Sequence, residues 1–276
     1  MSSPRVLVVE VHASDPVGRL GDWLTEADVE LDVVTEARSL DGYAGLVVLG
    51  GPQHADDEEL APIRQLVRDA VSSELPTLGV CLGGQLLAAA NGGRVEANPD
   101  GPEIGAQLIA KRAAASTDPL FGSLPITPDV LQWHFDAVTA LPPGAVQLAS
   151  SPMCEQQAFR LGRLAWGIQF HIETTPEIVR SWAAQDAANL PDHDLDLIVS
   201  RAAAVHEDIA EVWRPFAHAF AGVVREPESV PALRGVPTST AAPVTDPAAI
   251  RAALAAEAQG ARAVLPLPTA RPPGDE

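Results

Sequence analysis

The chain has 276 residues, a hydrophobic content of 46% and a formal net charge of −19. Its length and apolar content suffice for one large globular domain or two small ones. The acidic balance argues against a surface for nucleic acid or an anionic membrane, because phosphate groups are bound by clustered Lys and Arg. The sequence has no basic cluster, and no apolar run approaches the roughly 20 residues of a membrane helix, so we expect no nucleic-acid or membrane partner.

The cysteines and the N-terminus predict the compartment. The chain has two cysteines, Cys81 and Cys154, and its first residues lack the long apolar run of a signal peptide. Low cysteine usage is typical of a reducing environment, so we expect a cytoplasmic protein. No Cys and His residues have the spacing of a metal site, and we expect neither a metal nor a cofactor.

Strands and helices alternate over the N-terminal third of the chain. Apolar runs predict strands over residues 5–11, 29–34, 45–49 and 75–80. Helical spacing of apolar residues predicts helices after Pro16 and over residues 58–71, and Asp15 is expected to cap the first of them. The alternation predicts an α/β fold with an open, mostly parallel, doubly wound sheet flanked by helices.

The alternation of predicted strands and helices ends near residue 94. Short β-like segments, broken by Pro and Gly, predict a small antiparallel or mixed β section; they cover residues 104–109, 130–133, 146–149 and 157–161. A strand over 164–170 is followed by a helix that Thr175 caps and Pro176 opens, and then by two C-terminal helices, over 195–205 and 207–223. We assign residues 1–224 to one domain and the Pro- and Ala-rich residues 225–276 to a weakly structured tail.

Cys81 lies where an apolar strand runs directly into a predicted helix. Gly79 and Gly83 flank it, as small residues must where side chains would collide across a sharp turn. Such a nucleophile elbow exposes the sulfur and places it at a helix N-terminus, whose dipole stabilises a thiolate. The alternative is a packing cysteine, since free Cys is among the most buried residue types. Partner residues therefore have to decide between the two interpretations.

A base and an orienting carboxylate follow the strand over residues 164–170. In extended backbone, residues two apart point to the same side, so Glu173 can hold the imidazole of His171. The alternative is a solvent-exposed pair at a helix entrance. The turn at Gly50-Gly51-Pro52 either offers an N–H donor to an oxyanion or is only a tight turn. Three further predictions concern single residues: His134 is structural or lines the substrate site, His12 and His54 are pocket candidates, and Cys154 is structural.

Three ordered motifs resemble those of the class I, or triad, glutamine amidotransferases. They are Gly79-Val80-Cys81-Leu82-Gly83-Gly84-Gln85-Leu86-Leu87, Trp166-Gly167-Ile168-Gln169-Phe170-His171-Ile172-Glu173 and the turn Gly50-Gly51-Pro52. Together with Trp133-His134-Phe135-Asp136, their spread makes the chain most similar to stand-alone members akin to the glutaminase domain of GMP synthase. The resemblance covers roughly residues 5–224.

The resemblance implies a catalytic triad and a substrate. Cys81 would attack the side-chain amide of glutamine and form a γ-glutamyl thioester, with release of ammonia. His171 would act as base and then as acid, oriented by Glu173. The remaining implied site residues are Gly51 and Leu82, whose backbone N–H groups would form the oxyanion hole, and Gln85, His134, Phe135 and Asp136, which would bind the substrate.

Two features depart from the resembled family. Ile172 replaces the proline of the usual His-Pro-Glu, so a residue that fixes φ is lost, although we expect activity to survive. No synthetase pattern follows Val224, so we expect the ammonia to pass to a separate synthetase partner. Two alternatives stay open: hydrolysis of another γ-glutamyl amide or peptide, and a non-catalytic binding or regulatory module.

Overall fold

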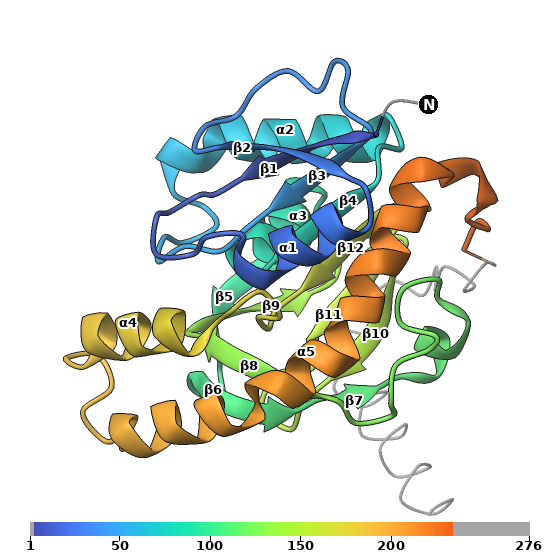
Figure 1. The fold of residues 1–276 in the computed structure, drawn as a ribbon. Helices are drawn as coiled ribbons and strands as arrows, with labels where there is room; N and C mark the ends of the chain where they lie inside the picture. The colour runs from blue at the N-terminus through green and yellow to red at the C-terminus, as the bar shows by residue number, and fades with distance from the viewer. Residues whose placement is uncertain (1–2, 234–276) are drawn as a thin grey trace, which may run out of the picture. The chain divides into compact units, whose positions relative to one another are not determined.

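A computed structural model describes residues 3–233 of the chain, and an eight-stranded sheet forms its centre (Figure 1). The strand order is β2-β1-β3-β4-β12-β11-β10-β7. The parallel strands are β2 (Glu30–Val34), β1 (Arg5–Val9), β3 (Gly45–Val48), β4 (Thr77–Val80) and β12 (Ala165–Ile168). The strands β11 (Ala158–Leu161), β10 (Ala145–Ser150) and β7 (Ala110–Lys111) continue the sheet in antiparallel pairs. The predicted open, mostly parallel sheet is confirmed.

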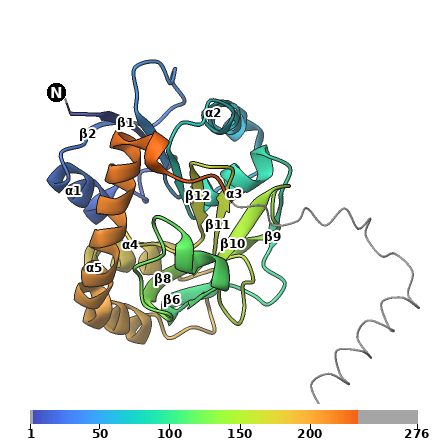
Figure 2. The same cartoon turned by 90° about the vertical axis from the view of Figure 1, so that its right-hand side faces the viewer.

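Helices cover both faces of this sheet (Figure 2). The helices are α1 (Gly18–Glu26), α2 (Ala61–Ser72), α3 (Leu82–Ala90), α4 (Pro176–Asp186) and α5 (Leu195–Arg225), with 3-10 turns η1 (Glu58–Leu60), η2 (Ala113–Thr117) and η3 (Pro227–Ser229). Along β1, Val6 and Val8 pack in the cluster that contains α1 and α5, whereas Leu7 and Val9 pack in the cluster that contains α2 and α3. Alternation along a strand thus gives two apolar cores, as a doubly wound sheet requires.

Two small antiparallel pairs extend the fold beyond the central sheet. They are β5 (Arg94–Ala97) with β9 (Asp136–Ala140), and β6 (Glu103–Leu108) with β8 (Asp129–His134). Trp133 of β8 and Trp182 of α4 pack in a third core cluster, which also includes residues of α5. The predicted antiparallel section is therefore confirmed. The short strands β5, β7 and β9 did not stand out in the sequence, because their burial is partial and their apolar alternation is weak.

Two sequence predictions about helices were wrong, whereas the predicted cap of α4 was confirmed. The two predicted C-terminal helices are one helix, α5, because the buried stripe continues through His206 and past the internal Pro215. Asp15 does not cap α1, which has no side-chain cap; the N–H of Val17 instead bonds Glu10 Oε1 at 2.8 Å. Thr175 does cap α4, through a bond from the N–H of Ile178 to its hydroxyl at 3.4 Å.

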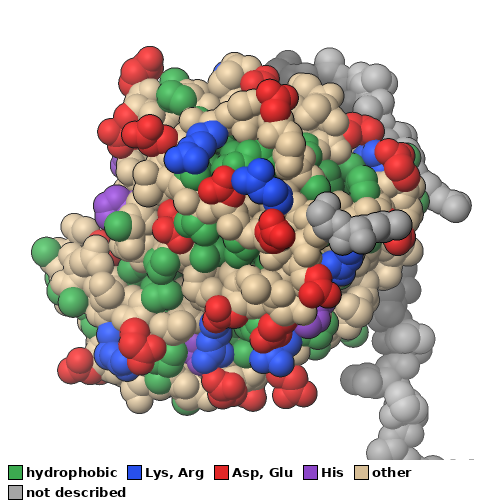
Figure 3. Space-filling view, turned by 45° about the horizontal axis from the view of Figure 1, so that its top comes forward, with side chains coloured by type: hydrophobic (Ala, Val, Ile, Leu, Met, Phe, Trp, Pro, Cys, Tyr) green, Lys and Arg blue, Asp and Glu red, His purple; other side chains and the backbone are tan. Residues whose placement is uncertain are grey.

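The outer surface agrees with the acidic composition. On the face drawn in Figure 3, Asp and Glu are interspersed with Lys and Arg, and the described residues form no basic patch there. Within residues 3–233, no helix is long and apolar enough to cross a membrane. The C-terminal part of the predicted tail, from residue 234, lies outside the described residues.

The turn into α3 is possible only because three glycines let backbones approach closely. A Cβ on Gly83 would lie 2.0 Å from the carbonyl oxygen of Val48, and one on Gly79 would lie 2.5 Å from that of Gly83. A Cβ on Gly84 would be 2.8 Å from the oxygen of Ile168. The start of α3 therefore lies directly against β3, β4 and β12.

Gly83→Ala is expected to lower the free energy of unfolding by about 3 kcal/mol or more, because the added methyl group meets a backbone atom that cannot move aside. Chemical denaturation measures the change. The matched control is Gly222→Ala in α5, where an added Cβ meets nothing within 4 Å. That variant should be more stable than wild type by roughly 0.5–1 kcal/mol, since alanine favours the helix over glycine. Equal stability of the two variants would contradict this account of the elbow.

Candidate active site

Cys81 occupies a strained turn between β4 and α3. It is the N-cap residue of α3 and has φ 51° and ψ −112°, a conformation rare for a residue with a side chain. Its N–H donates to the oxygen of Ile168 at 2.8 Å, which ties the turn to β12. The sulfur lines a cavity of about 470 Å³. Cys81 is only 6% exposed, so the elbow buries the cysteine more than the sequence predicted, while leaving it at the wall of the cavity.

His171 and Glu173 form a buried pair next to this sulfur. Nδ1 of His171 lies 2.6 Å from Oε1 of Glu173, and both side chains are 1% exposed. The sulfur of Cys81 lies close enough for its charge to act on the imidazole. Backbone bonds between His171 and Leu131 of β8 fix the segment, at 2.8 and 3.3 Å. The alternative of a solvent-exposed pair is therefore wrong, because α4 and β8 cover it.

The electrostatic surroundings favour a protonated imidazole. Burial lowers the pKa of His171, but the charges of Glu173 and Cys81 act in the opposite direction and raise this pKa well above the usual range. The raised pKa favours an imidazolium between the carboxylate of Glu173 and the sulfur of Cys81. Such a ring is a proton donor beside the sulfur.

The backbone of Ile172 helps to hold the carboxylate of Glu173. Its side chain is 1% exposed and belongs to the core, and its N–H donates to Oε2 of Glu173 at 2.9 Å. A proline at this position has no N–H to donate. Both oxygens of Glu173 are consequently occupied, one by His171 and the other by Ile172. The loss of a rigid φ is thus accompanied by an added hydrogen bond to the carboxylate of Glu173.

The cavity brings together most of the residues that the sequence singled out. Those lining it are Gly51, His54, Cys81, Gln85, His134, Phe135, Asp136 and His171. Glu173 lies behind His171, and Leu82 adjoins Gly51: a Cβ on Gly51 would be 3.2 Å from Cδ2 of Leu82. His12 does not line the cavity but bonds the hydroxyl of Ser14 at 2.8 Å.

Several cavity residues were missed in the sequence. Ser14, Asp15, Trp133 and Trp182 line the cavity, with Gln185, Asp186 and Asn189 at its α4 side. Asp15 accepts a hydrogen bond from the Ser14 hydroxyl, and burial raises the pKa of its carboxyl. Gln169, which is 2% exposed, touches the sulfur of Cys81. Its position two residues before His171 was the available signal, since alternation places both on one side.

His134 supports the wall of the cavity from behind. One ring nitrogen, Nδ1, bonds the oxygen of Asp136 at 2.8 Å, and Nε2 bonds Glu103 Oε2 at 3.1 Å. Glu103 also accepts from Ser151 and Gln157, each at 2.6 Å. This network joins the turn after β8 to the interior, and it fits the predicted structural or substrate-lining role of His134.

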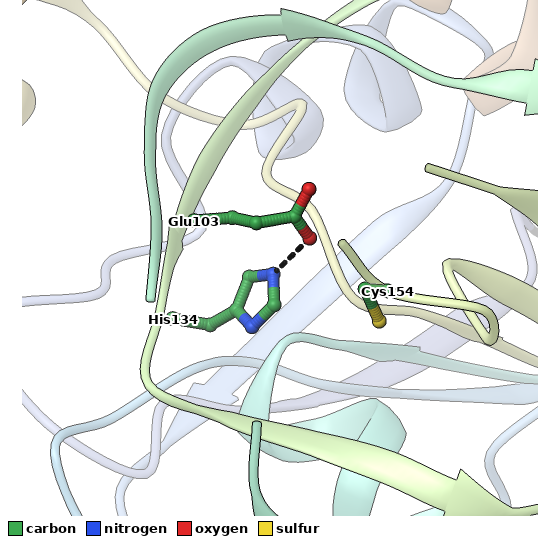
Figure 4. A group of neighbouring side chains, drawn as sticks. All are labelled: Glu103, His134 and Cys154. Atoms are coloured by element: carbon green, nitrogen blue, oxygen red, sulfur yellow. Dashed lines mark hydrogen bonds and ion pairs between the residues drawn. The ribbon is translucent and has the colours of Figure 1, made fainter. Parts of the chain in front are cut away.

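Glu103, His134 and Cys154 form a buried group whose possible ligand atoms lie within 4.8 Å of one another (Figure 4). The hydrogen bonds from Ser151 and Gln157 already occupy the Glu103 carboxylate. Burial, reinforced by the charge of Glu103, raises the pKa of the Cys154 thiol to about 12. A protonated thiol and an occupied carboxylate are poor ligands, so we interpret this group as structural support.

His54 and Asp136 bridge the mouth of the cavity. Nδ1 of His54 lies 2.6 Å from Oδ2 of Asp136, although the His54 side chain is 67% exposed. The hydrogen bond to Asp136 raises the pKa of His54. The pair links the turn after β3 to the start of β9, two segments that also carry Gly51 and the cavity-facing Phe135.

Comparison with known proteins identifies the family. The sequence model of the family described as "Glutamine amidotransferase class-I" matches residues 22–182, more than half of the 276 residues and a range that contains all three motifs. The chain belongs to the class-I glutamine amidotransferases. Its eight-stranded sheet, nucleophile-elbow turn and buried His-Glu pair are therefore features of a class-I glutamine amidotransferase domain.

Named relatives of this amidotransferase include two proteins that are each described as one subunit of a glutamine-hydrolysing GMP synthase. The one from Halobacterium salinarum is 38% identical over 47% of this chain and 66% of its own length. The one from Thermoplasma volcanium is 31% identical over 60% of this chain and 84% of its own length. The structure is similar to a glutamine amidotransferase from Thermotoga maritima, with a TM-score of 0.71, 27% identity and coverage of 80% of this chain and 99% of that one.

Replacing Glu173 by Gln is expected to lower the pKa of His171, because the carboxylate charge is one of the causes that raise it. The imidazole should then lose its proton at a lower pH than in wild type, which an NMR titration of labelled histidine measures. Glu177→Gln is the control, since Glu177 is an exposed carboxylate four residues further along the chain. An unchanged His171 titration in Glu173→Gln would show that the carboxylate does not set the protonation of the ring.

Proposed function

We propose that this amidotransferase domain hydrolyses the side-chain amide of glutamine, with Cys81 as nucleophile, His171 as base and acid, and Glu173 as the orienting carboxylate. The observation that carries the proposal is the buried series of contacts from Glu173 through His171 to Cys81, whose sulfur lies on the cavity. Membership of the class-I family supports the same chemistry.

The reaction proceeds in two halves. The Cys81 thiolate attacks the γ-carbonyl carbon, and the C–N bond breaks as His171 gives its proton to the departing nitrogen, which leaves as ammonia. A γ-glutamyl thioester remains on Cys81. Neutral His171 then takes a proton from a water that attacks the thioester, and glutamate departs as the sulfur regains the imidazolium as its partner. One water is consumed, and one glutamate and one ammonia are formed.

The oxyanion of each tetrahedral intermediate would lie between two backbone N–H groups, those of Gly51 and Leu82. Leu82 is the first residue of α3, where backbone N–H groups have no partner within the helix and the dipole favours negative charge. Gly51 adjoins Leu82 and follows the end of β3. We assign binding of the amino-acid part of glutamine to Gln85, Phe135 and Asp136, with His134 holding their turn in place.

We further propose that a separate synthetase accepts the ammonia. The two relatives from Halobacterium salinarum and Thermoplasma volcanium are each described as one subunit of a GMP synthase, which implies a further subunit in those proteins. An ammonia-consuming partner for this chain would bind near the cavity mouth, where His54, Phe135 and Asp136 lie. A synthetase that copurifies with this chain would identify the acceptor.

A second substrate class is favoured by the size of the cavity. A volume of about 470 Å³ falls in the range of roughly 300–1,000 Å³ that holds drug-sized ligands, which exceed glutamine in size. The space continues from the sulfur to Trp182, Asp186 and Asn189, and its lining within the described residues contains no Lys or Arg. A γ-glutamyl amide with a larger neutral or cationic amine is therefore the second candidate.

Cys81→Ala is expected to abolish ammonia release from glutamine and the covalent adduct with a glutamine-like diazoketone, because both need the sulfur. Intact mass spectrometry and an ammonia assay measure these two outcomes. Cys154→Ala is the matched control and should keep both signals, since Cys154 is a buried thiol outside the cavity lining. Wild-type protein that forms no adduct and releases no ammonia, alone or with candidate synthetases, would favour the non-catalytic binding module.

For the second candidate, γ-glutamyl anilides and γ-glutamyl amides of diamines are compared with glutamine at equal concentration. If the α4 side of the cavity receives the amine, we expect kcat/KM to be at least about tenfold higher for the larger amides, which corresponds to about 1.4 kcal/mol of added transition-state binding. The α-glutamyl isomers serve as controls and should not be cleaved. Turnover of glutamine alone would remove this candidate.

A further inference from the structure

Gln169 makes a contact with the nucleophile that the proposed triad does not use. Its Nε2 atom lies 3.7 Å from Sγ of Cys81, within hydrogen-bonding distance for sulfur, and the side chain is 2% exposed. The residue follows β12, and its N–H bonds the oxygen of Gln157 at 2.8 Å. The sulfur therefore has one side-chain hydrogen-bond partner, the amide of Gln169, and one backbone partner, the oxygen of Trp133 at 4.0 Å.

The direction of the Gln169 amide is fixed by a chain of hydrogen bonds that begins at a backbone carbonyl. Nε2 of Gln85 donates to the oxygen of Asp136 at 3.1 Å and to Oε1 of Gln169 at 3.2 Å. A carbonyl oxygen can only accept, so the nitrogen of Gln85 must face Asp136. Oε1 of Gln169 consequently faces Gln85, and the nitrogen of Gln169 must face the sulfur. Reversing Gln85 would place two oxygens against each other, and reversing Gln169 would place two donor nitrogens against each other.

We propose that Gln169 stabilises the thiolate of Cys81 by an N–H···S hydrogen bond, and that Gln85 acts through Gln169 as a positioning residue. The proposal rests on the proposed function of Cys81 as nucleophile. An N–H donor favours an ionised sulfur over a neutral thiol, because hydrogen bonds to charged acceptors are roughly twice as strong as neutral ones. The donor lies in a buried site, where water competes little for the sulfur.

This arrangement also connects the substrate-binding wall to the nucleophile. The oxygen of Asp136 accepts from Gln85 at 3.1 Å and from His134 Nδ1 at 2.8 Å. The same short turn thus carries two cavity residues, Phe135 and Asp136, and also sets the orientation of the two glutamines. A shift of that turn on substrate binding would therefore change the hydrogen bond to the sulfur, through Gln85 and Gln169.

The test measures the ionisation of Cys81 without requiring turnover. The rate of alkylation by iodoacetamide is followed against pH by mass spectrometry of the peptide that contains Cys81. In Gln169→Leu, which keeps the bulk but removes the donor, the midpoint of the profile should rise by about one pH unit. The rate below that midpoint should fall about tenfold. The other titratable groups lining the cavity are unchanged in every variant; they are Asp15, His54, His134, Asp136, His171 and Asp186.

Gln132→Leu is the matched control. Gln132 of β8 is also a fully buried glutamine, but its amide has no hydrogen-bond partner among the described residues. Its alkylation profile should coincide with that of wild type. A merely structural effect of losing a buried amide would move both variants, and the proposal would then be wrong.

Gln85→Leu tests the positioning role and covers the case in which Gln169→Leu does not fold. Its midpoint should move in the same direction by a smaller amount, because the Gln169 amide remains but is free to turn. The double variant should have the same alkylation profile as Gln169→Leu, since Gln85 influences the sulfur only through Gln169. A folded Gln169→Leu or Gln85→Leu with a wild-type profile would overturn the proposal. If the variants shift the alkylation profile but wild-type protein releases no ammonia, the proposal about Gln169 stands and the proposed function is refuted.

Discussion

The parallel pairing of β4 with β12 is the constraint on which the site depends. It aligns Val80 with Ile168, and the N–H of Cys81 extends the ladder by bonding the oxygen of Ile168. Two segments that are 88 residues apart at Cys81 and Gln169 thereby end side by side. The positive φ of Cys81 costs roughly 1–3 kcal/mol, and the structure holds this strain because α3 lies closely against three strands through its glycines. Without that contact the sulfur would not project into the cavity.

Charge is buried beside this pairing, and hydrogen bonds make the burial tolerable. Glu173 accepts from Ile172 and bonds His171, and its backbone oxygen accepts from the N–H of Arg19 at the start of α1 at 2.9 Å. The carboxylate itself is bonded at both oxygens, by His171 and by the N–H of Ile172, and is therefore far less costly to bury than an isolated one. The replacement of proline by Ile172 is therefore accompanied by compensation at the carboxylate itself. At position 172, the backbone N–H holds the buried charge of Glu173 and the side chain fills the core.

The walls of the cavity differ in how firmly they are held. The turn after β8 is tied to the interior by hydrogen bonds of His134 and Glu103, whose side chains are 1% and 0% exposed. The bridge between His54 and Asp136 is largely exposed on the His54 side, and such pairs contribute only about 0–1 kcal/mol. The inner wall is accordingly rigid, whereas the mouth can open at little cost. This difference suits the proposed function, in which the site fixes a reacting amide and still admits a ligand.

The order of strands and helices in the N-terminal third, the glycine-flanked cysteine and the His-x-Glu motif were readable from the sequence, because each is set by local periodicity or by residues a few positions apart. The sequence also indicated that these motifs end strands of one sheet. It misread Asp15 as a helix cap and divided α5 at His206, since capping and helix length depend on what packs against them. Only the tertiary structure decided that His171 and Glu173 are buried together, that Ile172 bonds the carboxylate and that Gln169 reaches the sulfur. Those contacts join distant segments, and their geometry follows from the register of paired strands, which no single stretch of sequence contains.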